Sequence, residues 1–336
     1  MVFRKSRRRQ TTFVFGLCVA CLLSHSACMS EKSGFENPKR LRLAVIPMGT
    51  THEFWKAIHA GAKKAADERG VEIIWKGPLK EDDRNDQIQI VETMINAGVD
   101  AIILTPLDDR ALMPPVADAR ARGIPTVIFN TALAGSDHIA YVATDSWKGG
   151  VLAAERIGSL LRGQGKLILI RIIEGIEGNR QREEGFLETI RSKFPDMIIL
   201  SDNQYAGITT ETAYQTTENL LARFPDVEAI FTPNESTTFG CLRALQDHGL
   251  AGRVIHVGFD SSKKLIEGLE KRELMGLVLQ DPVRMGYESV RTAVAHLRGE
   301  PYESLIDTGV YLATPENMNK PEVWRLLVPD LSILDR

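Results

Sequence analysis

Two stretches of the chain repeat one another at a spacing of about 130 residues, and this repeat constrains the fold more than any other feature. Residues 99–106 (VDAIILTP) correspond to residues 227–233 (VEAIFTP), and residues 126–130 (TVIFN) correspond to residues 254–260 (VIHVGFD). Each copy is an apolar run that is too short for a helix and ends on a polar side chain, which is typical of a buried parallel strand. Ligands of open α/β sheets bind at these carboxyl ends. Two such sheets that faced each other would therefore line one cleft.

Strand-like and helix-like patterns alternate along the rest of the chain. Residues 41–46 and 71–75 predict strands, and residues 55–68 and 86–97 predict helices that each run into a glycine. This alternation predicts parallel, doubly wound sheets built by right-handed crossovers. The chain has 336 residues, of which 43% are hydrophobic and 25% charged, so two domains can each bury a core.

The first 27 residues have the order of a secretory signal peptide. Five lysine or arginine residues are followed by an apolar run over residues 13–23 and by small residues before Cys28. The apolar run is too short to span a bilayer comfortably as a permanent anchor, so we expect export. The formal net charge of −3 includes these five cations and no acidic residue before Cys28, which leaves about −8 for the rest and argues against a nucleic-acid partner.

The Ala27-Cys28 pair resembles a bacterial lipobox, in which the cysteine is acylated and becomes the first residue of the mature protein. Three residues before it stands His25, where such boxes usually carry leucine. Two outcomes therefore stay open: a lipid anchor at Cys28, or cleavage that releases a free periplasmic protein. Residues 28–40 are polar and predict a tether. Either way, the expected location is the periplasm or the outer face of the membrane.

Motifs for catalysis and for cofactors are missing from the sequence. It contains no Walker A sequence, no Gly-x-Gly-x-x-Gly after the first strand, no Gly-x-Ser-x-Gly elbow and no His/Cys pair at metal-ligand spacing. An enzyme would need a nucleophile or an acid/base pair beyond Asp260 and Glu235. We therefore expect no enzymatic activity, no cofactor and no bound metal.

Six short motifs, in their order and spacing, resemble a periplasmic sugar-binding protein of the ribose/galactose-binding type. They are residues 52–55 (HEFW), 144–150 (TDSWKGG), 180–186 (RQREEGF), 233–235 (PNE), 257–260 (VGFD) and 280–282 (QDP). The resemblance implies the type I periplasmic binding protein fold, an α/β fold with two doubly wound parallel-sheet domains joined by a three-segment hinge. It implies a first lobe of residues 41–143 plus 281–308 and a second lobe of residues 144–280 plus 309–336.

The resemblance also implies a ligand site between the lobes. Aromatic rings of the first motif would stack on a sugar face, and Arg180 matches the sugar-binding arginine of the family, whereas Arg182 is interpreted as structural. The implied ligand-binding residues are His52, Phe54, Trp55, Thr105, Asn130, Thr131, Arg180, Asn234, Asp260 and Gln280. Structural roles stay open as alternatives: core packing for the aromatic pair, a surface ion pair for Arg180, and helix capping or turn formation for the polar residues.

Two departures from the ribose-binding pattern limit what can be said of the ligand. Asn130 and Thr131 stand where ribose binders have an Asp-Arg pair, and Thr105 replaces an asparagine. The site thereby loses an acceptor charge, so we do not expect the ribose mode of binding. Relatives of similar pattern bind pentoses, hexoses, deoxysugars, inositol or the furanose-like signal autoinducer-2.

The implied function is that of a monomeric extracytoplasmic solute-binding protein. It would capture a monosaccharide-like ligand or polyol in the interdomain cleft and deliver it to the permease of an ABC importer. A periplasmic sensor that serves a chemoreceptor or a histidine kinase stays open as an alternative, as does an autoinducer-2-type binder. A sugar-responsive repressor of the same fold would need an N-terminal helix-turn-helix, where this chain has an export signal.

Overall fold

The computed structural model describes residues 40–335, which contain two six-stranded sheets. The predicted signal peptide (residues 1–27), Cys28 and the tether as far as residue 39 lie outside the described residues. Within residues 40–335, no helix combines the length and the apolar character needed to cross a membrane.

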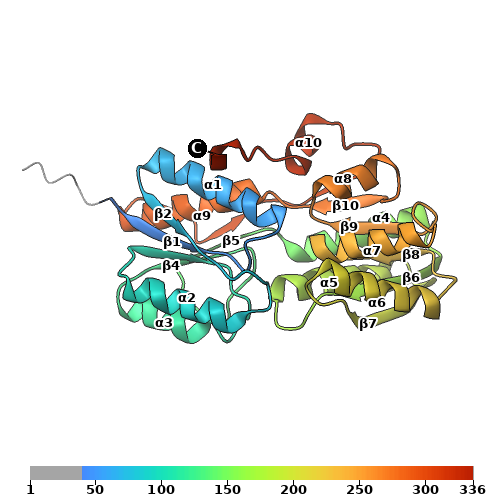
Figure 1. Ribbon diagram of the computed structural model, residues 1–336, viewed down its shortest axis with the longest axis horizontal. Helices are drawn as coiled ribbons and strands as arrows, with labels where there is room; N and C mark the ends of the chain where they lie inside the picture. Colours follow the sequence, from blue (N-terminus) through green and yellow to red (C-terminus); the bar gives the residue numbers. More distant parts are fainter. Residues whose placement is uncertain (1–39, 336) are drawn as a thin grey trace, which may run out of the picture. The chain divides into compact units, whose positions relative to one another are not determined.

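The first sheet is parallel throughout and has the strand order β11-β5-β4-β3-β1-β2. Two helices cover each of its faces, with α1 and α9 on one face and α2 and α3 on the other (Figure 1). The strands are β1 (Arg42–Ile46), β2 (Glu72–Trp75), β3 (Ala101–Leu104), β4 (Thr126–Phe129), β5 (Ala140–Ala143) and β11 (Leu305–Asp307). The helices are α1 (Glu53–Arg69), α2 (Arg84–Asn96), α3 (Met113–Ala121) and α9 (Pro282–Leu297). We call this sheet and its helices the first lobe.

The second sheet has the order β12-β10-β9-β8-β6-β7 and is parallel except for β12, which runs antiparallel to β10. Helices α4 and α5 cover one face, α6 and α7 the other, and α8 and α10 pack over the edge near β10. The strands are β6 (Gly165–Arg171), β7 (Met197–Tyr205), β8 (Ala229–Phe231), β9 (Ile255–Phe259), β10 (Gly276–Leu279) and β12 (Tyr311–Ala313). The helices are α4 (Ser146–Leu160), α5 (Glu177–Lys193), α6 (Thr210–Arg223), α7 (Glu235–Asp247), α8 (Lys263–Glu270) and α10 (Pro321–Leu327). These elements form the second lobe, and the two doubly wound sheets confirm the predicted α/β class.

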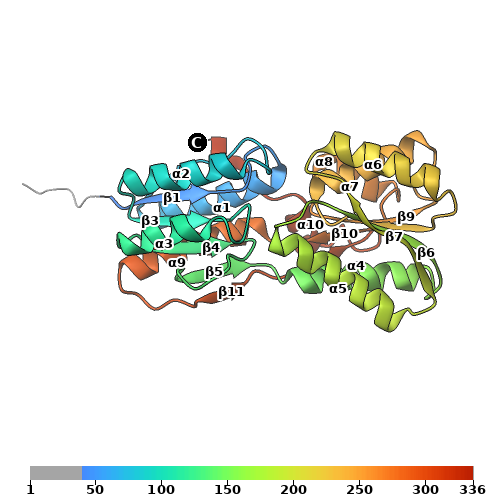
Figure 2. The same ribbon diagram turned by 90° about the horizontal axis from the view of Figure 1, so that it is seen from below.

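The chain passes between the lobes at three neighbouring points, after β5, after β10 and after β11 (Figures 1 and 2). The C-terminal residues then return from the second lobe to the first. The short 3₁₀ helix Ser332–Asp335 contacts α1, although the expected partition assigned it to the second lobe. The final turn of the described chain therefore packs on the first lobe.

Glycines allow one pair of helices in each lobe to approach unusually closely. In the first lobe, a Cβ atom added to Gly61 of α1 would lie 1.9 Å from the carbonyl oxygen of Val283 in α9. In the second lobe, a Cβ atom on Gly150 of α4 would lie 2.0 Å from the carbonyl oxygen of Arg182 in α5. No side chain fits at either position, because the backbones themselves are in contact.

Candidate functional site

A cavity lies between the two lobes, where the carboxyl ends of strands from both sheets face each other. This is the position at which open α/β sheets bind their ligands. The first lobe lines it with Met48, His52, Phe54, Trp55, Glu81, Asn130 and Thr131, and the second lobe with Ile176, Gly178, Asn179, Arg182, Asn234, Glu235, Asp260 and Gln280. We call this space the cleft.

The aromatic wall of the cleft is held by a carboxylate that was not predicted from the sequence. The rings of Phe54 and Trp55 meet edge to face, with centroids 4.9 Å apart. The indole Nε1 of Trp55 donates to Glu81 Oε1 at 2.6 Å, and His52 Nδ1 lies 2.8 Å from the same oxygen. Burial alone would lower the pKa of His52, but the hydrogen bond and charge of Glu81 outweigh it and raise this pKa to about 9. His52 is therefore cationic at neutral pH, and its side chain does not cap α1.

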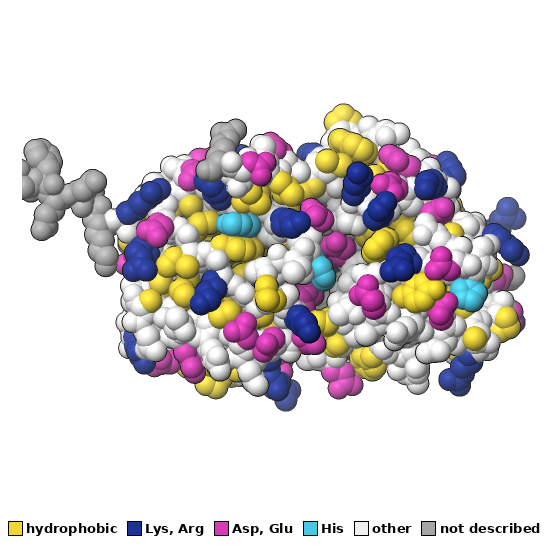
Figure 3. All heavy atoms as spheres, in the orientation of Figure 1, with side chains coloured by type: hydrophobic (Ala, Val, Ile, Leu, Met, Phe, Trp, Pro, Cys, Tyr) yellow, Lys and Arg dark blue, Asp and Glu magenta, His cyan; other side chains and the backbone are white. Residues whose placement is uncertain are grey.

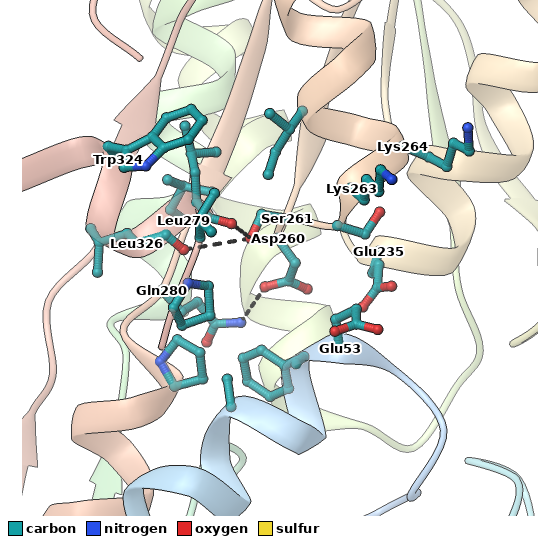
Figure 4. A pocket seen from close by; sticks show the side chains of 18 of the residues that line it. Glu53, Glu235, Asp260, Ser261, Lys263, Lys264, Leu279, Gln280, Trp324 and Leu326 are labelled. Atoms are coloured by element: carbon teal, nitrogen blue, oxygen red, sulfur yellow. Dashed lines mark hydrogen bonds between the residues drawn. The ribbon is translucent and has the colours of Figure 1, made fainter. Parts of the chain in front are cut away.

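The opposite wall carries a buried arginine and a buried carboxylate. Arg182 Nη1 donates to the carbonyl oxygen of Pro233 at 2.9 Å and lies 4.0 Å from Asp260 Oδ2. The guanidinium also covers the ring of Phe259 at 3.9 Å from its centroid. Gln280 Nε2 donates to Asp260 Oδ1 at 2.8 Å, as the close view in Figure 4 shows. Burial raises the pKa of Asp260, and Arg182 and Gln280 oppose that rise.

Arg180 lies on the solvent side of α5, contrary to the role that the resemblance implied. Its guanidinium binds Glu177 and Glu184 on the same helix, and 54% of the side chain is exposed. Arg182, interpreted as structural from the sequence, is only 5% exposed and lines the cleft. A step of two residues along a helix turns a side chain by about 200°, which places the two arginines on opposite faces.

Thr105 also lies outside the cleft. It is completely buried at the end of β3, and its carbonyl oxygen accepts a hydrogen bond from Gln87 Nε2 at 2.8 Å. Oε1 of the same Gln87 accepts a hydrogen bond from the backbone amide of Leu107 at 2.8 Å. Thr105 therefore belongs to the support beneath the cleft, not to its lining.

Two of the predicted polar residues make structural hydrogen bonds as well as lining the cleft. Asn234 Oδ1 accepts the amide of Thr237 at 3.0 Å and so caps α7. Thr131 Oγ1 accepts the amide of Gly178 at 2.9 Å, a bond that runs from the first lobe to the second. The cleft that remains has a volume of about 40 Å³, room for no more than a few water molecules. A sugar ring can therefore enter only if the walls move apart.

Glu81 and Glu235 line the cleft but were not among the predicted ligand-binding residues. Glu81 follows β2 in an acidic loop, and Glu235 directly follows Asn234 at the start of α7. The strand-end rule that selected Asn234 could have found its neighbour Glu235, but not Glu81, which lies within the loop after β2. The backbone amide of Phe54 in the opposite lobe favours the ionised form of Glu235.

A wider groove of about 810 Å³ lies next to the cleft and shares four of its lining residues. The shared residues are Phe54, Glu235, Asp260 and Gln280. Apolar side chains of α10 and the C-terminal segment line one side, including Trp324 and Leu326 (Figure 4). The cleft therefore borders a second space whose lining includes residues of both lobes.

Comparisons with known proteins agree with this arrangement. The family model described as "Periplasmic binding protein domain" matches residues 43–301. The ribose import binding protein of Bacillus subtilis is 27% identical over 298 residues, which cover 89% of this chain and 95% of that protein.

Solved structures give the same result. A carbohydrate transporter solute-binding protein from Agrobacterium radiobacter, in complex with D-arabinose, has a TM-score of 0.84 and 29% identity, and the match covers 87% of this chain and all of that one. An ABC transporter solute-binding protein from Agrobacterium vitis with bound D-fucose has a TM-score of 0.82 and 32% identity, over 85% of this chain and all of that one. These matches confirm the resemblance seen in the sequence motifs. The chain therefore belongs to the periplasmic binding protein family, with the type I fold.

Proposed function

We propose that this protein captures a sugar-like solute in the cleft and delivers it to the permease of an ABC importer. The observation that carries the proposal is the convergence of an aromatic wall from the first lobe and a polar wall from the second on one small cavity. Sugar faces carry C–H groups that pack on aromatic rings, while their hydroxyl groups need donors and acceptors at the rim. Relatives whose names or structures specify a sugar support this class of ligand.

The polar wall offers the donors and acceptors that hydroxyl groups require. Arg182 supplies a planar set of N–H donors, Asp260 accepts in charge-assisted bonds, and the Asn234 amide can both donate and accept. Asn130, Thr131 and Gln280 complete the rim. In this proposal Arg182 takes the ligand-binding role that the sequence motif suggested for Arg180.

Ligand capture would proceed by hinge motion. Two contacts link the lobes across the cleft: a hydrogen bond from Gly178 to Thr131, and the interaction of the Phe54 amide with the Glu235 carboxylate. They would break when the lobes part around the three crossing segments, and would form again around the ligand. A solute that contacts both walls has a higher affinity for the closed form and therefore shifts the hinge equilibrium.

The proposal includes no chemical step, so the solute would be released unchanged. The protein would act as a monomer on the periplasmic side, and an acyl chain on Cys28 would keep it at the membrane surface. The closed form would present both lobes to the permease, or to a receptor in the alternative sensing role.

A thermal-shift screen of the purified protein tests the proposal. The panel should contain pentoses, hexoses, deoxysugars, amino sugars, polyols and autoinducer-2. A true ligand at 100 times its dissociation constant should stabilise the folded state by about 2.7 kcal/mol. The Asp260→Asn variant is the matched control. It should lose at least half of the shift, while without ligand it unfolds at the same temperature as the wild type. A flat response across the whole panel would contradict the proposal.

A further inference from the structure

The cleft holds more carboxylates than cations. Glu81, Glu235 and Asp260 line it, against the two cationic side chains of His52 and Arg182. With every group ionised, the cleft carries one negative charge in excess. In Figure 3 acidic side chains gather on the visible face where the two lobes meet.

Among the described residues, the fully buried side-chain atoms of the cleft lining that lack a hydrogen-bond partner are mostly acceptors. Gln280 is only 3% exposed, and its Oε1 has no hydrogen-bond partner among the described residues. Glu235 Oε2 and Asn130 Oδ1 are likewise buried and unpartnered, whereas Arg182 Nε is the one fully buried side-chain donor of the lining that lacks a partner among the described residues. Leaving a buried polar atom unpaired costs about 1–3 kcal/mol, so these atoms call for a ligand rich in donors. A hydroxyl offers one donor, but an ammonium group offers three together with a positive charge.

Glu235 is the carboxylate best placed to receive such a group. It lines both the cleft and the adjoining groove, and in Figure 4 its side chain lies beside that of Glu53 from α1. Burial raises the pKa of Glu235 to about 7, the charges of Asp260 and Glu81 add to this rise, and His52 and the Phe54 amide oppose it.

The lysines near Glu235 do not enter the cleft, so a further cation can bind to this carboxylate there. Lys263 and Lys264 of α8 line the groove, but neither lines the cleft, and Lys264 is already paired with Glu267. The buried Oε2 of Glu235 has no hydrogen-bond partner among the described residues, and the cationic His52 whose charge acts on Glu235 is itself paired with Glu81.

From this arrangement we infer that the ligand of the cleft carries a primary ammonium group beside its hydroxyl groups, as an amino sugar or an amino polyol does, and that Glu235 and Gln280 receive it. The inference rests on the proposed function and narrows the class of solute. The ammonium group would supply donors to the unpartnered oxygens of both residues and would neutralise the excess charge. It would also hold Glu235 in its ionised form.

Titration calorimetry on the purified protein tests the inference with matched probes. D-glucosamine and D-galactosamine are compared with D-glucose and D-galactose, and with the N-acetylated forms, which keep the nitrogen but lose its charge. We expect an amino sugar to bind at least about tenfold more tightly than its neutral counterpart, because a charge-assisted hydrogen bond replaces a neutral one.

Proton release provides a second readout that does not depend on affinity. At pH 6 the amine is protonated and Glu235 is mostly protonated, since its pKa is about 7. Binding of the amine should expel the proton of Glu235, so the measured heat should change with the ionisation enthalpy of the buffer. A neutral sugar should release no proton.

Two variants locate the effect. Glu235→Gln should abolish both the amine preference and the proton release, whatever its effect on the affinity for neutral sugars. Glu53→Gln removes the neighbouring carboxylate of α1, which does not line the cleft, and should preserve both. Equal affinity for neutral and amino sugars, or an amine preference that survives Glu235→Gln, would overturn the inference alone. If neither kind of sugar bound, the inference would be wrong, and the proposed function would then be decided by the response of the wider thermal-shift panel.

Discussion

Asn130 and Asp260 occupy equivalent positions in the two lobes and share the same uncommon backbone conformation. Their φ angles are 63° and 66°, in the left-handed region that few non-glycine residues adopt. Each donates its amide to the neighbouring strand of its own sheet, Asn130 to Val142 at 2.9 Å and Asp260 to Val278 at 2.8 Å. Asparagine and aspartate tolerate this conformation better than other side chains. The internal repeat therefore preserves a backbone turn that directs one polar side chain from each sheet into the cleft.

This conformation decides which substitution can test Asp260. Alanine would add backbone strain to the loss of the carboxylate, whereas Asp260→Asn keeps a residue that accepts positive φ. We expect Asp260→Asn to fold normally and to lose roughly 1.5–3 kcal/mol of ligand affinity, because a charge-assisted hydrogen bond is weakened. Titration calorimetry with the ligand from the thermal-shift screen measures this loss, and an unchanged affinity would remove Asp260 from the binding site.

The two arginines of α5 provide a matched pair of variants. Arg180→Ala removes exposed ion pairs with Glu177 and Glu184, so stability should change by no more than about 1 kcal/mol and ligand affinity should stay the same. Arg182→Lys retains the charge but loses the planar set of donors, and should weaken binding at least about tenfold. The reverse result in titration calorimetry would restore the role implied by the sequence motif.

Ligand binding should change the fluorescence of Trp55. Its indole is 3% exposed and hydrogen-bonded to Glu81 at the wall of the cleft, so a sugar stacked nearby alters its surroundings. For the wild type, emission spectra with and without ligand should differ. They should differ equally for the control variant Trp147→Phe, which changes a half-exposed ring on α4. Trp55→Phe should abolish most of the difference. A full signal in that variant would exclude Trp55 as the reporter.

The His52–Glu81 pair should make stability depend on pH. A pKa raised from 6.5 to about 9 means that the folded state binds this proton more tightly than the unfolded state. The stabilisation is complete below pH 6.5 and is lost as the pH rises towards 9, by roughly 1–2 kcal/mol after allowance for partial exposure. Urea unfolding at pH 6.5 and pH 9 should show this loss in the wild type. His52→Asn and Glu81→Gln should both reduce it, and a wild-type slope retained in either variant would contradict the assignment.

The close contact between α1 and α9 should be intolerant of a single methyl group. Alanine normally stabilises a helix interior by about 1 kcal/mol relative to glycine. In Gly61→Ala the new Cβ would lie 1.9 Å from the Val283 carbonyl oxygen, so the helices must separate. We expect a net loss of roughly 1–3 kcal/mol in the free energy of unfolding, measured by urea titration. A variant as stable as the wild type would show that the contact can relax.

The sequence predicted those parts of the site that depend on the strand pattern. Asn130 and Asp260 were found because an apolar run leads directly to each of them. Arg182 was missed because a helix presents opposite faces within two residues, so a motif match displaced by two positions selects the wrong arginine. Glu81 lies in a loop with acidic neighbours at Asp82 and Asp83, and only the tertiary structure shows which carboxylate reaches Trp55.

The position of α9 constrains the order in which the protein can acquire its structure. This helix covers the same face of the first sheet as α1, yet it is encoded after every strand of the second sheet except β12. One face of the first sheet therefore stays partly uncovered until residues 282–297 have been added to the chain and can pack on it. In a chain that is exported from its amino terminus, most of the first lobe would emerge early and yet stay incomplete until α9 follows, and any factor that shields nascent chains would be needed longest at β3, β4 and β5, the strands that α9 contacts.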